Sequence, residues 1–130
     1  MKNILVLLII IISFSTAAQN TSVPFDKKIF KEKKDAFKIA VDNLEEGDNY
    51  YELGHNPAIG FSIWSKAIPF YKKANDFNPD NASLNYKLGN CNLVSIHKYY
   101  ALDYFIQAYK LKPTIAKDIH YKIGRAYQYQ

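Results

Sequence analysis

The chain has little of what a disulfide-stabilised domain or an enzyme needs. Its only cysteine is Cys91, so no disulfide can form within the chain. Cys91 lies inside an apolar helical pattern and is expected to be a small core residue, although an intermolecular bridge or a reactive thiol stays open. His97 and His120 are the other catalytic candidates, but the sequence has no metal-spaced histidine pair, carboxylate cluster or glycine-rich phosphate loop. We therefore expect no enzymatic activity, no cofactor and no metal.

The longest apolar run is also too short for a membrane span. Residues 4–12 are apolar, whereas a span needs roughly 20 such residues. Lys2 precedes this run, and the small residues Thr16, Ala17 and Ala18 follow it. This order predicts a signal peptide over residues 1–18, cleaved after Ala18, and hence an exported protein. An uncleaved membrane anchor is the alternative. The cleavage site has no cysteine, so a lipoprotein is not expected.

Acidic residues are fewer than basic ones, and the formal net charge is +5. Much of the excess lies in "DKKIFKEKK", within the segment 19–33, which we interpret as a basic solvated linker or a frayed helix start. Contact of this segment with an anionic lipid or polymer is the alternative. The chain also has 11 tyrosines and 8 phenylalanines. Most recur at helical spacing, so we assign them to packing and expect no nucleic-acid partner.

An internal repeat dominates the rest of the chain. "KAIPFYKKANDFNPDN" (residues 66–81) aligns with "YALDYFIQAYKLKPTI" (residues 100–115), each pair of positions being 34 apart. "LNYKLGNC" recurs 35 positions later as "IHYKIGRA", which puts one extra residue in the loop before it. A period of 34 is typical of a helix-turn-helix repeat.

The residue types at the repeated positions have a physical reason. Two antiparallel helices approach closely where side chains are small, so Gly89 and Ala101 are expected at the crossing of the two helices in the second repeat. Ala108 is expected where the second helix meets the next repeat, and Phe105 fills the space between. Pro113 marks the helix end, because proline cannot continue a helix.

The first repeat is less regular. Its first helix is predicted over residues 34–53 and its second over residues 63–77, starting or kinking near Trp64 or Ser65 because of Pro69. A long turn, residues 54–60, separates them. Gly89 precedes Ala101 by 12 positions, but the residue 12 positions before Ala67 is not a glycine.

In its order of Gly89, Ala101, Phe105, Ala108 and Pro113, the chain resembles the tetratricopeptide repeat (TPR) family. The resemblance implies an all-α helix-turn-helix solenoid of about two and a half repeats, over residues 34–130, after the signal peptide. Repeats are expected at residues 34–81 and 82–115, with a partial one at 116–130. The chain is also similar to the start of secreted Gram-negative proteins that continue into β-propeller-like repeats and an OmpA-like domain. This implies a location in the periplasm or at the outer membrane.

The family is non-catalytic and holds a peptide or partner protein on a concave face made by the first helices. The resemblance therefore implies a protein–protein interaction scaffold of the cell envelope, with a membrane-anchored structural fragment of a larger OmpA-like protein as the alternative. The implied contact positions are Ser83, Tyr86, Asn90, Leu93, Val94, Asp118, Tyr121, Arg125, Gln128 and Tyr129. Tyr86, Asn90, Tyr121 and Arg125 are the predicted partner-binding residues, since they can supply aromatic area, an amide and a cation. Some members of the family bind acidic C-terminal tails through a carboxylate clamp of lysine and asparagine residues at set offsets. This sequence does not have that pattern, so we expect no preference for such tails.

The last helix, "DIHYKIGRAYQYQ", is a first helix without a second one after it in the sequence. We expect part of its apolar side, Ile119, Ile123, Ala126 and Tyr127, to pack near Phe105 and Ala108. The remainder is expected to stay in water, so that the chain is either a fragment of a longer protein or is completed by another chain that docks at the half-repeat.

Overall fold

A computed structural model describes residues 20–130, and within this range helices are the only regular elements. The predicted signal peptide and its cleavage site lie outside the described residues. The predicted all-α class is confirmed for the part that is described. The elements are η1 (Lys31–Lys33), α1 (Lys34–Leu53), η2 (Phe61–Ala67), α2 (Ile68–Phe77), α3 (Ala82–Leu93), η3 (Lys98–Tyr100), α4 (Ala101–Leu111) and α5 (Ile119–Tyr127), the η elements being 3₁₀ helices.

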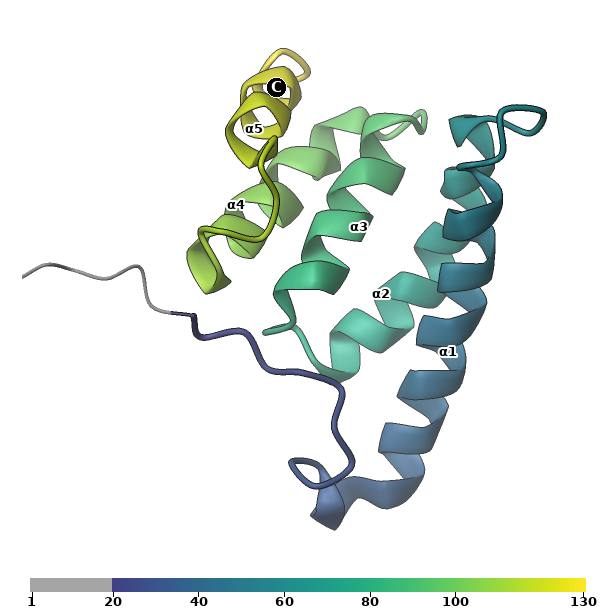
Figure 1. The fold of residues 1–130 in the computed structure, drawn as a ribbon, viewed down its shortest axis with the longest axis vertical. Coiled ribbons are helices and arrows are strands. Elements are labelled where there is room, and N and C mark those ends of the chain that lie inside the picture. Colours follow the sequence, from purple (N-terminus) through teal and green to yellow (C-terminus); the bar gives the residue numbers. More distant parts are fainter. Residues whose placement is uncertain (1–19) are drawn as a thin grey trace, which may run out of the picture.

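Each α-helix packs on the next one along the chain, from α1 to α5. Figure 1 shows these helices side by side in chain order. The predicted first helix, residues 34–53, coincides with α1. α3 and α4 lie within the predicted second repeat, and α5 within the partial one.

Asparagine and proline set the helix boundaries. The Asn81 side chain accepts a hydrogen bond of 2.8 Å from the Leu84 backbone N–H and so caps α3. α2 ends two residues before Pro79, and α4 ends two residues before Pro113. Pro113 therefore acts as the predicted stop, and Pro79 acts in the same way 34 residues earlier.

The predicted start of α2 near Trp64 or Ser65 is wrong. The chain forms a 3₁₀ helix, η2, through Ala67, and the regular α-helix begins only at Ile68. Pro69 then lies in the first turn of α2, where its missing N–H removes no helical hydrogen bond. Trp64 anchors η2, since its indole N–H donates to the Tyr51 carbonyl at 2.7 Å and its ring stacks on Tyr51.

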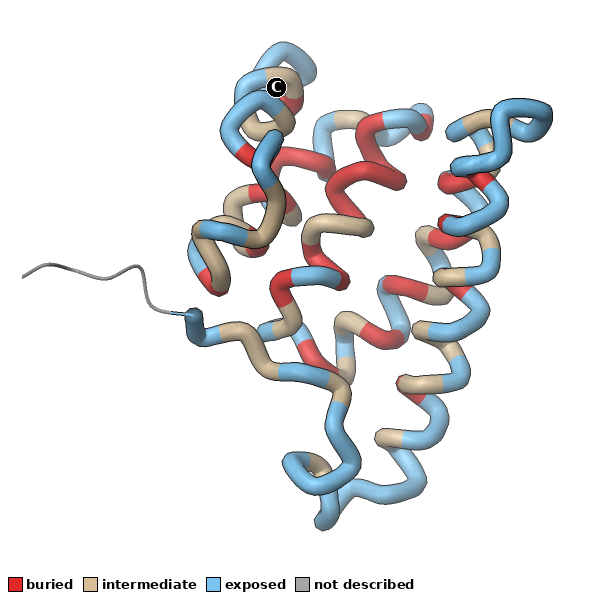
Figure 2. The backbone as a smooth tube through the Cα atoms, in the orientation of Figure 1, coloured by how far each residue is buried: buried red, intermediate tan, exposed pale blue. Residues whose placement is uncertain are grey.

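The core consists of two adjoining clusters, seen in Figure 2 as buried positions on the facing sides of the helices. The first lies among α1, η2, α2 and α3, and the second among α3, α4 and α5. Their buried members are, respectively, Tyr51, Trp64, Ala67, Tyr71, Ala74, Leu84, Leu88 and Cys91, and Leu93, Ala101, Leu102, Phe105, Ile119 and Ala126.

In each complete helix pair, a glycine of the first helix lies against an aromatic ring of the second helix. A Cβ on Gly89 would lie 2.5 Å from the Phe105 ring, and a Cβ on Gly47 would lie 2.4 Å from the Tyr71 ring. Tyr71 and Phe105 are 34 positions apart, so the two contacts are equivalent. The first repeat therefore does have a crossing glycine, which the fixed period missed. The fixed period expects this glycine 34 residues before Gly89. Gly47 lies eight residues before that position, because the turn over residues 54–60 is long.

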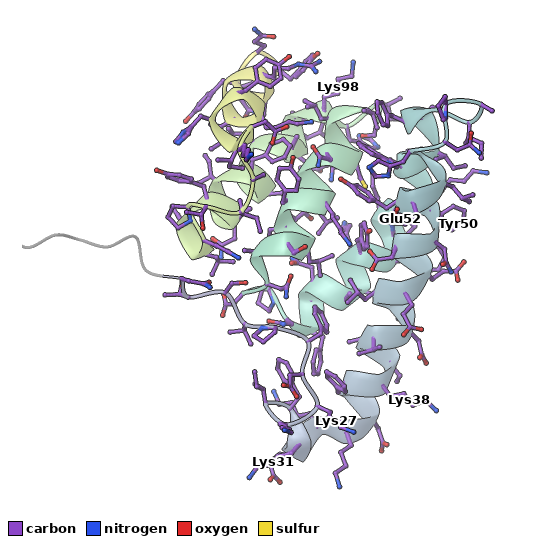
Figure 3. All side chains as sticks on the ribbon, in the orientation of Figure 1. Lys27, Lys31, Lys38, Tyr50, Glu52 and Lys98 are labelled. Carbon is purple, nitrogen blue, oxygen red and sulfur yellow. The ribbon has the colours of Figure 1, made fainter. Side chains whose placement is uncertain are left out.

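The segment predicted as a solvated linker is bonded to the helical body. The Thr21 N–H donates to the Leu111 carbonyl at 2.8 Å, and the Val23 N–H donates to the Asp80 carbonyl at 2.7 Å. We call residues 20–30 the N-terminal strap; Figure 1 shows it passing below the ends of α4, α3 and α2 toward α1. Its lysines stay exposed, and Figure 3 labels Lys27 of the strap and Lys31 of η1 at the lower end of the molecule.

Candidate functional site

Polar side chains link the first helices, α1, α3 and α5, to one another at the surface. Lys87 of α3 forms an ion pair of 2.7 Å with Asp48 of α1. On the other side of α3, the Tyr86 hydroxyl donates to Asp118, immediately before α5, at 2.8 Å. We call the surface formed by these side chains the first-helix face; it lies on the helices for which the sequence predicted a partner-binding face.

Asp48 is the centre of the polar contacts between α1 and α3. It accepts hydrogen bonds from the Tyr71 hydroxyl at 2.5 Å and from the Lys87 ammonium at 2.7 Å. The ammonium also lies 5.5 Å from the centre of the Tyr51 ring, within the range of a cation–π contact. Burial, followed by the hydrogen bond to Asp48, raises the pKa of Tyr71 well above its ordinary value. Tyr71 therefore stays protonated near neutral pH, and it keeps its donor role.

A cavity of about 220 Å³ lies beside this ion pair, between α1 and α3. The strap supplies Pro24 and Phe25 to its wall, so the cavity is bounded by three separate segments. Its other lining residues are Leu44, Asp48, Asn81, Ser83, Leu84 and Lys87. Half of its lining residues are apolar, and the other half are polar or charged.

The four predicted partner-binding residues do not form one exposed cluster. Tyr86 is half-buried by its contact with Asp118, whereas Tyr121 is 63% exposed on α5 and Arg125 is half-exposed on the same helix. Asn90 is only 3% exposed. The structure thus brings Tyr121 and Arg125 together, but it places Asn90 inside the molecule.

The prediction that Asn90 offers its amide to a peptide is wrong for this conformation. Its amide N–H donates to the Tyr51 hydroxyl at 2.9 Å, and its carbonyl oxygen has no hydrogen-bond partner within residues 20–130. Tyr51 comes from the last turn of α1 and covers this position, since α1 is longer than α3. Leu93, another predicted contact position, is also buried, in the second core cluster.

Asp48 and Lys87 were missed by sequence reasoning. The signal for Asp48 was its position directly after Gly47, which corresponds to Asn90 after Gly89 and to Arg125 after Gly124. That correspondence becomes visible only when Gly47 is recognised as the crossing glycine of the first repeat. Lys87 had no comparable signal, because the family's contact offsets do not include its position.

The three catalytic candidates do not come together. Cys91 is fully buried in the first core cluster, as expected, and burial raises the pKa of its thiol to about 12. Such a thiol is almost entirely protonated at neutral pH and is a poor nucleophile. His97 lies exposed after α3, and His120 lies exposed on α5 beside Tyr109. Within residues 20–130, no three histidine, cysteine or acidic side chains are grouped so that they could hold a metal ion.

None of the helices in the described part of the chain is long and apolar enough to cross a membrane. Comparison of the chain with protein-family models, with curated proteins and with solved structures finds no match. The class of protein is therefore inferred from the internal repeat, the helix packing and the first-helix face.

Proposed function

We propose that this chain is a TPR-type scaffold that binds a partner protein or an extended peptide on its first-helix face. The observation that carries the proposal is the recurrence of one packing unit. In both helix pairs a glycine of the first helix lies against an aromatic ring of the second, and the two rings are 34 residues apart. Stacked units of this kind leave a row of first helices whose side chains can contact a ligand.

The first-helix face has chemistry suited to a protein ligand. Its cavity offers apolar contact with Phe25 and Leu44, with Ser83 exposed at the edge. Asp48 neutralises Lys87 at the cavity, so we do not propose selection of an acidic peptide there. Arg125 and the strongly exposed Tyr121 extend the face onto α5. A non-catalytic role fits the buried, protonated Cys91 thiol.

The test compares two surfaces of one folded chain. The first-helix variant carries Ser83→Tyr, at the edge of the cavity, and Arg125→Ala. The matched control carries Ser65→Tyr at an exposed position of η2 and Lys110→Ala at an exposed position of α4. It therefore also adds one tyrosine and removes one cationic side chain. Both variants should keep the parent's helical circular dichroism, because none of these side chains belongs to the buried clusters.

Affinity capture from a cell-envelope extract, followed by mass spectrometry, should recover a specific partner with the parent and the control. The first-helix variant should recover at least several-fold less of it. Equal recovery by the parent and the first-helix variant would contradict the proposed binding face. Asn90→Ala is unsuitable for this test, since it would remove an internal hydrogen bond to Tyr51.

We also propose that the protein is exported to the periplasm or the outer membrane, on the basis of the signal-peptide pattern in residues 1–18. Mass spectrometry of the protein from envelope fractions should give an N-terminus at Gln19. An intact Met1 would instead favour the membrane-anchored alternative.

A further inference from the structure

Two adjoining cavities lie between α2 and the segment that joins α3 to α4. One, of about 360 Å³, is lined by α2, the last turn of α3, η3 and α4. The other, of about 540 Å³, is lined by η2, the start of α2 and the turn after α3. Ile68 and His97 line both cavities, so the two form a continuous hollow. Both volumes fall within the range of roughly 300–1,000 Å³ that is usual for small-molecule sites.

The smaller of the two, which we call the polar cavity, can receive an anion. Its lining residues are one aliphatic residue, one cation, one amide and three rings: Ile68, Lys72, Asn92, His97, Tyr100 and Tyr104. The Lys72 ammonium forms no ion pair within residues 20–130, and no carboxylate lines either cavity. Burial raises the pKa of Tyr104, and Asp76 and Asp103 raise it further, but both acids lie outside the lining. An anion in the polar cavity therefore meets an unpaired cation.

Asn92 supplies a hydrogen-bond acceptor to the polar cavity. The residue is 3% exposed, and its amide N–H donates to the Leu88 carbonyl at 2.8 Å, which fixes the orientation of the amide. No hydrogen bond among the described residues ends on its Oδ1. The Asn90 oxygen is enclosed in the protein, whereas Asn92 lines a cavity that a ligand can enter. A ligand with an N–H group therefore gains a hydrogen bond at the Asn92 Oδ1.

The larger of the two, which we call the apolar cavity, suits an aliphatic chain. Its apolar lining residues are Ile68, Pro69, Val94 and Ile96. Ile96 is 89% exposed, so a ligand that covers it removes apolar surface from water. The hydroxyls of Ser65 and Ser95, which also line this cavity, each donate to the backbone carbonyl three residues earlier. Because these hydrogens are already used, a chain without polar groups fits better than a peptide backbone.

We propose that the two cavities form one site for a small amphipathic anion, an acylated amino acid. Its amide N–H donates to the Asn92 Oδ1, its carboxylate pairs with the Lys72 ammonium, and its aliphatic chain fills the apolar cavity. The inference goes beyond the proposed function, because the site shares no residue with the side chains that define the first-helix face.

The probe is N-octanoylglycine, titrated into the purified protein and followed by isothermal titration calorimetry. We expect saturable binding of one molecule per chain. N-octanoylsarcosine carries a methyl group in place of the amide hydrogen, and N-octanoylglycinamide lacks the anion. Each should bind about tenfold more weakly or worse, since each loses one hydrogen bond or charge interaction with a defined partner. N-acetylglycine, which lacks the long chain, should also bind more weakly by about tenfold or more.

Variants of the protein test the two ends of the site separately. Lys72→Gln should weaken binding of N-octanoylglycine about tenfold but leave binding of N-octanoylglycinamide unchanged, because only the first ligand is an anion. Lys73→Gln, at the next exposed position and outside both cavities, is the matched control and should bind like the parent. Ile96→Asn should weaken binding several-fold, whereas Ile39→Asn, at a position of α1 that is 63% exposed, should not. All four side chains are exposed, so circular dichroism should show parent-like helix content.

Absence of saturable N-octanoylglycine binding would overturn the proposal. Equal affinities for N-octanoylglycine and N-octanoylsarcosine, or an affinity that Lys72→Gln leaves unchanged, would also overturn it, because unspecific apolar contact would then explain the binding. A peptide C-terminus offers the same carboxylate and amide, so tighter binding of acetyl-Leu-Leu-Gly than of N-octanoylglycine would overturn the assignment to a small molecule. Ser83→Tyr should leave N-octanoylglycine binding unchanged, so a failure of the first-helix-face proposal is distinguishable.

Discussion

Replacing each of the three crossing glycines by alanine should change stability with opposite signs. Every replacement gains helix propensity, which is worth about 1 kcal/mol for alanine over glycine inside a helix. At Gly124 the new methyl group meets no atom of the described residues within 4 Å, so the gain should appear as increased stability. At Gly89 the methyl group would lie 2.5 Å from the Phe105 ring, and at Gly47 it would lie 2.4 Å from the Tyr71 ring.

The two rings cannot move away easily, because Tyr71 and Phe105 are both 0% exposed. Overpacking of this kind typically costs about 1–3 kcal/mol, and the upper part of that range applies to rings held on all sides. After the gain in propensity, Gly47→Ala and Gly89→Ala should each lower the free energy of unfolding by about 1–2 kcal/mol. Gly124→Ala should raise it by about 0.5–1 kcal/mol.

Urea and thermal denaturation followed by circular dichroism measure these differences. In a domain of this size, 1 kcal/mol corresponds to roughly 4–8 °C in melting temperature, so the signs are easily resolved. The double variant Gly89→Ala with Phe105→Leu should lose less stability than the sum of the two single changes, because the smaller side chain relieves the clash. A stabilising Gly89→Ala, or a destabilising Gly124→Ala, would refute the equivalence of the three positions and the packing derived from it.

Three further outcomes follow from burial and hydrogen bonding. Cys91 should react with a thiol reagent only at the rate of unfolding, and rapid labelling of the native protein would contradict its burial. Asn81→Ala should cost about 1–2 kcal/mol, measured by urea denaturation, since it removes the α3 cap and a 2.9 Å bond to the Val23 carbonyl; Asp80→Ala is the control. Burial raises the pKa of Tyr51 above its ordinary 10.0, so the contribution of Tyr51 to stability should be constant up to about pH 10 and should be lost above it, as the unfolded chain ionises first; a Tyr51→Phe variant should show a smaller fall in stability above pH 10.

Much of the helical order could be predicted from local sequence. The period of 34 and the prolines at its end placed α3, α4 and the end of α2, because small residues, aromatic residues and helix stops act over a few positions along the chain. The apolar stripe of residues 34–53 predicted α1 with its observed bounds. The burial of Cys91 and the division of α5 into a packed and an exposed side also followed from helical spacing alone.

Other features depended on contacts between distant segments. Gly47 became recognisable only through its contact with Tyr71, because the long turn shifts it from the fixed period. Asn90 was expected at the surface, but Tyr51, 39 residues away, covers it. The strap likewise depends on backbone hydrogen bonds from Thr21 and Val23 to carbonyl groups at the ends of other segments, and backbone groups carry no signal in side-chain composition. Local sequence determined which residues form helices, whereas packing between helices decided which of their side chains remain free to bind.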